Sequence, residues 1–383
     1  MSALLPLHGH DAARSALNQA VATGQLPGSL LLHGPAGVGK QRLGLWLGQR
    51  LLCTAPRPDG PCDECTACRL ALRLEHPDLH WFFPLPRPKG ATGPEKLAEA
   101  LEDARAAELD ARRNNPLRVP TPGEPVGLYL AQIHTLRRIA AQRPAMGPRK
   151  VFLIGDAEYL VPQESSPEAA NALLKVLEEP PPETTIILTA SNPDALLDTI
   201  RSRLLPVRLR PLPHDEVAAF LVRHGGVAPE AARAAARLAE GSIGRALAFL
   251  PVDGEPGPLE TLRQDARAYL AAAIASSPVP RLAAAHACSP TGARGTFYDT
   301  LEFLTLWLRD LAAAAAGAEE LVVNADAIDF LRDLARRLPS AGAVDDAIRA
   351  VDEARALAYG NVNPQLILAH LLAGLRRALT GRP

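Results

Sequence analysis

The stretch LLLHGPAGVGKQRLG, Leu30 to Gly44, decides the fold of this 383-residue chain. A short apolar run leads into a glycine-rich turn, and a helical pattern starts at its end. This order of strand, turn and helix is the context of a phosphate-binding loop. In such a loop, backbone N–H groups surround a phosphate, a lysine reaches it, and a Ser or Thr hydroxyl binds Mg²⁺. The candidate nucleotide-binding residues are therefore Gly34, Gly37, Gly39, Lys40 and Gln41.

Gln41 departs from this pattern, because it stands where the loop requires Ser or Thr. An amide on a longer side chain is a poor substitute for that hydroxyl, since Mg²⁺ demands near-ideal octahedral geometry. A second departure lies in VFLIGDAEYL, where Gly155 directly follows the apolar run and Asp156 comes one position late for a metal-binding carboxylate. Shifting the alignment would make Asp156 the ligand and Glu158 a base, but it breaks the spacing. The sequence favours a loop kept for its shape over hydrolysis, and leaves nucleotide binding open.

Apolar runs alternate with helical patterns along the first half of the chain. GSLLLHG, RKVFLIGDAEYL, TTIILTAS and RLLPVRLRPL predict four strands, and the alternation predicts a parallel α/β sheet. Residues 84–125 are rich in Pro, Gly and charge, which indicates an exposed insertion with a helix at Pro94–Arg113. After Pro213 the strand pattern stops, three helices follow, and a PVDGEPGP hinge precedes Ala- and Leu-rich helices. We expect three domains, at 1–210, 211–252 and 258–383.

Four of the five cysteines are close together, at Cys53, Cys62, Cys65 and Cys68. The spacing C-x8-C-x2-C-x2-C is typical of a structural zinc site, in which four thiolates complete a tetrahedral shell. HPDLHW follows, and it holds His76 and His80 at helical spacing. A histidine can replace a zinc ligand, but four cysteines already fill the shell.

The charge balance limits how this chain binds partners. Its net charge of −1 gives no overall basic field of the kind that binds nucleic acid, so partners would have to be recognised by local patches. The N-terminus shows no leader pattern, and there is no uninterrupted apolar run of eighteen residues. We expect a soluble cytoplasmic protein with no membrane contact.

Several longer motifs resemble one family. HGPAGVGK, the cysteine cluster after the loop's helix, GSIGRAL and LAYGNVNPQLILAHLL contribute, and the most specific block is AANALLKVLEEPPPETTIILTASNPDALLDTIRSR at 169–203. The chain resembles the delta-prime family of bacterial DNA polymerase III clamp-loader subunits, which are AAA+ proteins related to gamma and tau. The resemblance implies an AAA+ domain, a helical lid and a helical collar. It also implies gamma/tau and delta partners in a five-subunit ring that loads the sliding clamp on primed DNA.

The resemblance also implies an arginine finger. In the family a Ser-Arg-Cys motif presents an arginine to the ATP of the neighbouring subunit. Here the motif reads Ser202-Arg203-Leu204, so Arg203 is the candidate, with Arg201 as the alternative. A guanidinium supplied in trans neutralises charge that develops on the γ-phosphoryl group.

The lid motif departs from the pattern of the ATP-hydrolysing relatives. Their phosphate-sensing arginine follows Gly-Ser closely, whereas here Gly244 occupies its position and Arg245 comes one residue later. One residue is about 100° around a helix, so we expect Arg245 to face away from a nucleotide. The implied function is a non-hydrolysing stator of the DNA polymerase III holoenzyme. A gamma/tau-type motor subunit and an unrelated zinc-containing ATPase are the alternatives.

Overall fold

The computed structural model describes residues 4–91, 93–119, 126–160, 168–290, 295–360 and 362–382. These residues form two compact units. The first comprises the described residues up to Val119 together with Val126–Leu247, and the second begins at Ala248. The finer three-domain division stays a prediction.

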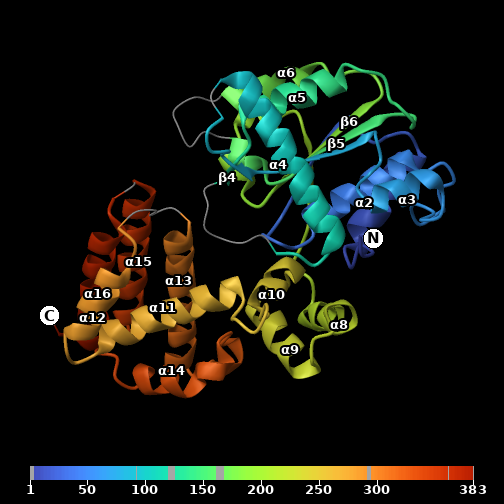
Figure 1. Cartoon of the computed structure of the whole chain (residues 1–383). Coiled ribbons are helices and arrows are strands. Elements are labelled where there is room, and N and C mark those ends of the chain that lie inside the picture. The colour runs from blue at the N-terminus through green and yellow to red at the C-terminus, as the bar shows by residue number, and fades with distance from the viewer. Residues whose placement is uncertain are drawn as a thin grey trace. The chain divides into compact units, whose positions relative to one another are not determined.

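A parallel five-stranded sheet forms the centre of the first unit, in the strand order β2-β5-β6-β1-β7. Its strands β5 and β6 are labelled in Figure 1. Its strands are β1 (Ser29–His33), β2 (Leu79–Phe82), β5 (Lys150–Ile154), β6 (Thr184–Ala190) and β7 (Leu205–Arg208). The parallel α/β sheet is confirmed, and β1, β5, β6 and β7 lie in the four runs that predicted them. The edge strand β2 was missed. It contains His80, which stacks on Phe152 of β5, so the helical spacing inferred for His76 and His80 is wrong.

Helices cover both faces of the sheet. Successive side chains of a strand point to opposite faces, so a strand whose residues are all apolar needs a packing partner on each face. Leu31 of β1 packs in one core cluster with the helices α5 and α6, while Leu30 and Leu32 pack in another with α2 and α4. The elements around the sheet are α1 (Asp11–Ala22), α2 (Lys40–Leu52), α3 (Thr66–Leu72), α4 (Pro94–Asn114), α5 (Leu130–Ala140), α6 (Glu168–Glu178), α7 (Asp198–Arg201), the 3-10 turns η1 (Ala157–Leu160) and η2 (Pro193–Ala195), and a small antiparallel pair, β3 (Leu85–Pro86) with β4 (Val126–Gly127).

Helix α4 is the helix predicted within the 84–125 insertion, and it packs against the core. Leu101 is 1% exposed, and the Arg112 guanidinium lies 4.4 Å from the ring centroid of Trp81 and 4.3 Å from that of Phe83. The expectation that the whole insertion is exposed is therefore wrong for this helix. Its periodic apolar positions give it a buried face despite the high charge. Thr92 and residues 120–125 lie outside the described part of the chain.

Three helices follow the sheet, as predicted from the end of the strand pattern at Pro213. They are α8 (His214–Gly225), α9 (Pro229–Leu238) and α10 (Ile243–Phe249). Helix α8 ends at Gly225 and is capped by Gly226, which has a left-handed φ of 63°. Glycine adopts this conformation without the steric cost that a Cβ adds, so it is a common helix terminator.

The second unit is helical throughout its described residues, as the Ala- and Leu-rich sequence predicted. Its elements are α11 (Pro258–Ile274), α12 (Val279–Ala287), α13 (Thr296–Ala315), η3 (Glu319–Leu321), η4 (Ala325–Ala327), α14 (Ile328–Ala335), α15 (Ala343–Tyr359) and α16 (Pro364–Thr380). The stretch LAYGNVNPQ contains the end of α15 and the start of α16. Asn363 caps α16, because its side-chain oxygen accepts a hydrogen bond from the backbone N–H of Gln365 at 2.8 Å. No helix in the described residues is long and apolar enough to cross a membrane.

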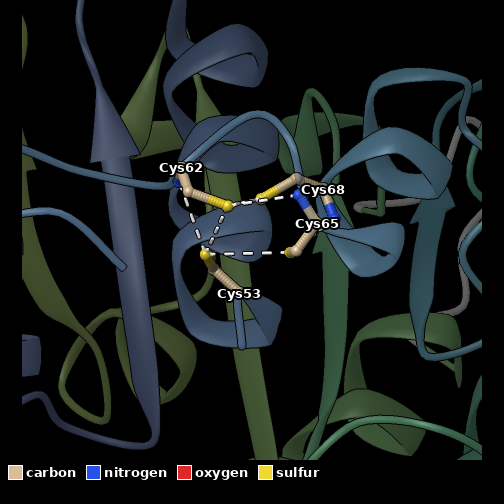
Figure 2. Close-up of side chains that lie close together, drawn as sticks. All are labelled: Cys53, Cys62, Cys65 and Cys68. Atoms are coloured by element: carbon tan, nitrogen blue, oxygen red, sulfur yellow. Dashed lines mark hydrogen bonds between the residues drawn. The ribbon is translucent and has the colours of Figure 1, made fainter. Parts of the chain in front are cut away.

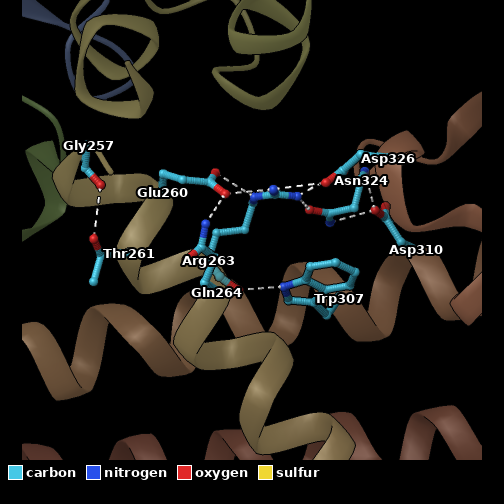
Figure 3. Close-up of polar contacts among 9 residues, drawn as sticks. All are labelled: Gly257, Glu260, Thr261, Arg263, Gln264, Trp307, Asp310, Asn324 and Asp326. Carbon is cyan, nitrogen blue, oxygen red and sulfur yellow. Dashed lines mark hydrogen bonds and ion pairs between the residues drawn. The ribbon is translucent and has the colours of Figure 1, made fainter. Parts of the chain in front are cut away.

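A polar network fixes α11 to the η4 region of this unit (Figure 3). The guanidinium of Arg263 pairs with Glu260 at 2.8 Å and with Asp326 at 2.9 Å, and it donates to the side-chain oxygen of Asn324 at 3.0 Å. Asp310, which is fully buried, accepts hydrogen bonds of 2.7 Å from both the backbone and the side-chain nitrogen of Asn324. A buried charge is tolerated only when it is paired in this way.

Candidate functional site

The predicted phosphate loop connects β1 to α2 at the end of the sheet. Gly34, Gly37 and Gly39 all have positive φ values, of 150°, 69° and 112°, so the loop has the sharp backbone that its glycines allow. Gly37 also needs the absence of a side chain, since a Cβ there would lie 2.6 Å from the hydroxyl of Ser242. The loop shape predicted from the sequence is therefore present.

Lys40 points back into its own loop. Its ammonium group donates to the carbonyl oxygens of Gly34 at 3.0 Å and Pro35 at 2.8 Å, and to the hydroxyl of Ser191 at 2.8 Å. An ammonium group has three donors, and these three bonds use them all. The residue is 4% exposed. In this arrangement Lys40 stabilises the loop itself and offers no donor to a phosphate.

Gln41 is in the first turn of α2, and its side chain contacts the residues that follow β5. Its amide nitrogen donates to a carboxylate oxygen of Asp156 at 2.8 Å, and its amide oxygen accepts from the indole nitrogen of Trp81 at 3.0 Å. A Cβ placed on Gly155 would lie 2.6 to 2.9 Å from all three heavy atoms of the Gln41 amide group. Gly155 therefore leaves the space that the Gln41 amide occupies. The two departures from the sequence pattern belong to one packed unit.

The acidic groups beside the loop are held in a poorly hydrated place. Burial raises the pKa of Asp156, although Lys40, Arg112 and the Gln41 hydrogen bond act in the opposite direction. Burial also raises the pKa of Glu158, whose carboxylate accepts a 2.9 Å hydrogen bond from the backbone N–H of Ser191. A metal-binding carboxylate at this position would face a cation. The Asp156 carboxylate instead faces the neutral amide of Gln41, which donates a hydrogen bond to it.

The start of helix α10 is attached to the same loop. The Ser242 hydroxyl donates to the Ala36 carbonyl at 2.8 Å, and the backbone N–H of Gly244 donates to the Gly37 carbonyl at 3.0 Å. A Cβ on Gly244 would lie 3.0 Å from the Cα of Gly37. Glycine at position 244, noted in the sequence as a departure, allows this close contact between two backbones.

The four clustered cysteines meet at one point, as their spacing predicted (Figure 2). Their sulfur atoms lie within 4.8 Å of one another, with 3.5 Å between Cys53 and Cys62, 3.8 Å between Cys62 and Cys68, and 4.0 Å between Cys65 and Cys53. A tetrahedral ion with Zn–S bonds of about 2.3 Å has S–S separations of about 3.8 Å. The donor set and the geometry fit a four-cysteine metal site, and neither His76 nor His80 joins it.

The local backbone prepares these thiols for a cation. The N–H groups of Cys62, Cys65 and Cys68 donate to the sulfurs of Cys53, Cys62 and Cys65, at 3.4, 3.3 and 3.4 Å. Burial opposes ionisation of Cys65, but hydrogen bonds from Thr54 and the Cys68 backbone outweigh it and lower the pKa of Cys65 to about 6. Burial raises the pKa of Cys53 and of Cys68, so the thiols of the cluster are not all shifted in one direction. Thiolates are the form that binds metal. Cys53 directly follows α2, so the cluster holds the far end of the helix that starts at the phosphate loop.

The two arginines considered for the finger have different surroundings. Arg201 pairs with two carboxylates, Asp194 and Asp198. Arg203 pairs with one, Glu178, at 2.8 Å, and donates to the carbonyl oxygen of Thr199 at 2.7 Å. The sequence patterns did not point to Glu178, Trp81 or Ser191. The tryptophan and the serine contact the loop only because β2 and β6 place them beside it, and no local motif marks such long-range contacts.

Comparison with known proteins agrees with this architecture. The sequence model of the DNA polymerase III delta-subunit family matches residues 9–213. The sequence model of the C-terminal part of the delta subunit matches residues 265–377. The delta-prime subunit of Escherichia coli is 30% identical over 310 residues, covering 81% of this chain and 77% of that one. The Bacillus subtilis delta-prime subunit is 25% identical over 92% of each chain. The Pseudomonas aeruginosa delta-prime subunit is 34% identical, but the match covers 45% of this chain and 40% of that protein.

Among solved structures, a gamma-subunit-related DNA polymerase III protein from Thermotoga maritima aligns over 95% of this chain and 99% of its own, at 15% identity and a TM-score of 0.43. The parallel sheet with a phosphate loop between β1 and α2, followed by helices, defines the class of α/β P-loop proteins. The chain belongs to the DNA polymerase III delta-subunit family, and its matches over most of its length include delta-prime subunits.

Proposed function

We propose that this chain is a delta-prime-like subunit of the DNA polymerase III clamp loader. It acts as a non-hydrolysing stator in a five-subunit ring with gamma/tau and delta subunits in the cytoplasm. Through that complex it helps to open the sliding clamp and place it on primed DNA. Family membership supports this assignment, and so do relatives named as delta-prime, gamma and tau subunits.

The contacts of Gln41 carry the proposal that the chain does not hydrolyse ATP. Hydrolysis needs Mg²⁺ held near the loop and a lysine directed at the phosphates. Gln41 instead joins Asp156 to Trp81, and Lys40 is used by its own loop. The Gln41 contact with Asp156 argues against Mg²⁺ binding, and together with the Lys40 contacts it argues against the gamma/tau-type motor alternative. A nucleotide would have to displace the Lys40 contacts before its phosphates could enter.

Arg203 is the better candidate for the arginine finger. An exposed ion pair is weak, so an arginine with a single ion-pair partner can still engage a phosphate on a neighbouring subunit through its remaining donors. Arg201 would have to leave two carboxylates, Asp194 and Asp198, whereas Arg203 has a single ion-pair partner. A guanidinium has five N–H donors. Arg203 contacts Thr199, Ser202 and Glu178 through its two terminal nitrogens, which leaves its Nε donor available.

We assign the four-cysteine cluster to a structural zinc ion. Four protein thiolates complete a tetrahedral shell and leave no position for a substrate. The ion would fix the loop at 53–65 against the end of α2. Nearby contacts support such a scaffold, because Gln49 of α2 donates to Asp63 of the module at 2.7 Å.

ATP binding and turnover by the isolated chain, measured with Mg²⁺, test this function. We expect no turnover above a protein-free control, together with a stable complex when gamma/tau and delta subunits are added. Turnover by the isolated chain would favour the motor alternative. Failure to assemble with those subunits would contradict the clamp-loader assignment itself.

A further inference from the structure

We propose that Glu178 is a positioning residue for Arg203. It fixes the guanidinium in an orientation that serves the ATP site of the adjoining subunit. This inference rests on the proposed function, because it takes Arg203 to be the finger. It adds a residue from a different helix to that role.

The contact joins two elements that are distant in the sequence. Glu178 is the last residue of α6, and three prolines follow at 180–182. Arg203 follows α7 and lies between two buried residues in the sequence. Ile200 of α7 is buried before it, and Leu204 is buried directly after it. Both buried residues belong to the core cluster that contains the apolar face of α6. The backbones of the two partners are therefore fixed, and only their side chains extend to the surface.

The position of Glu178 is electrostatically unfavourable unless a cation lies beside it. The C-terminal end of a helix carries a partial negative charge, so carboxylates are disfavoured there and cations are favoured. Glu178 ends α6, and Glu179, which is exposed, follows it. Arg203 neutralises this end through its 2.8 Å ion pair with Glu178. Residues that depart from such a local preference are more frequent at functional sites.

The guanidinium is held from two sides and remains accessible. One terminal nitrogen pairs with Glu178, and the other donates to the Thr199 carbonyl. The side chain of Arg203 is nevertheless 36% exposed, so an anion from another subunit can reach it while both contacts persist. An arginine loses considerable rotamer freedom when it is ordered. Contacts that already order it reduce the loss that would otherwise accompany the engagement of a phosphate.

The test is a double-mutant cycle in the complete clamp-loader complex, assembled with sliding clamp and primed DNA. Steady-state kcat and KM for ATP are compared for wild type, Glu178→Ala, Arg203→Ala and the double variant. The matched control is Glu179→Ala, which removes the neighbouring carboxylate. We expect Glu178→Ala to lower kcat about 1.5- to 5-fold, the factor that corresponds to an exposed ion pair, with little change in KM. In the Arg203→Ala background it should have no further effect.

A purely structural role for Glu178 would lower the rate equally in both backgrounds, and this result would overturn the proposal. An unchanged rate for Glu178→Ala, or an increase, would also overturn it, since an increase means that the ion pair holds Arg203 away from its target. Failure of the underlying function looks different. In that case Arg203→Ala itself would leave the rate unchanged, whatever residue stands at 178.

Discussion

Replacing Gly155 by alanine tests whether Gln41 and Gly155 form one packed unit. The φ of Gly155 does not lie in the left-handed region, so its backbone accepts alanine. The new Cβ would approach the Gln41 amide to 2.6 Å and force this flexible side chain away. The displaced amide would lose its bonds to Asp156 and Trp81. A hydrogen bond to a charged group contributes about 1.5–3 kcal/mol, and an unpaired buried N–H adds to the loss, so we expect a destabilisation of about 2–4 kcal/mol.

The same substitution in a Gln41→Ala background should be nearly neutral, because the amide that it displaces is gone. The expected coupling between the two sites is therefore the whole cost of the substitution in the wild type, about 2–4 kcal/mol. Calorimetry of the full chain measures it, and a loss of about 2–4 kcal/mol lowers the melting temperature of a unit of this size by roughly 5–10 °C. The indole N–H resonance of Trp81 gives an independent readout. Equal costs of Gly155→Ala in both backgrounds, with an unmoved indole resonance, would refute the packing account.

Three further predictions concern the stability of the two units. Removing the metal with a chelator, or replacing its ligand in Cys65→Ser, should increase the amide hydrogen exchange of residues 53–68. Unchanged exchange would contradict a metal-dependent module. Asp78 accepts backbone hydrogen bonds from Ala145, Met146 and Gly147, which outweigh burial and hold its pKa below its usual 3.8. The Asp78 carboxylate therefore stabilises the folded protein at neutral pH, and this stabilisation is lost as the pH falls through the folded-state pKa. Asp78→Asn should lower the free energy of unfolding by about 2–3 kcal/mol at pH 7 and make unfolding less dependent on acid pH. Arg263→Met should cost about 2–3 kcal/mol in the second unit, because it leaves carboxylates unpaired, and a cost near zero would show that the network contributes nothing.

Much of the fold could be predicted because its signals are local. The apolar runs that became β1, β5, β6 and β7 are short and clearly bounded, and helices separate them in the sequence. The cysteine spacing predicted the metal cluster directly, since two CxxC turns bring their thiols together. Strand β2 escaped prediction because LHWF is four residues long and pairs with β5, about seventy residues later.

The candidate site was only partly accessible from the sequence. Gln41 and Gly155 could be recognised as separate departures from a pattern, but their direct contact spans 114 positions and depends on how α2 packs against β5. The orientation of Lys40 could not be predicted either. It depends on the Ser191 hydroxyl at the end of β6, and no local pattern connects that residue with the loop. Side-chain contacts of this kind follow from tertiary packing, which overrides what a motif alone suggests.

ATP hydrolysis by the assembled clamp loader, with and without Arg203→Ala in this chain, tests the central claim most directly. An arginine finger contributes a large factor at the site that it serves. We predict that this complex loses more than half of its clamp- and DNA-stimulated rate, while Arg201→Ala leaves most of it and the isolated chain has none. A full rate with Arg203→Ala, or ATP turnover by the isolated chain, would contradict the account of a stator that supplies its finger in trans.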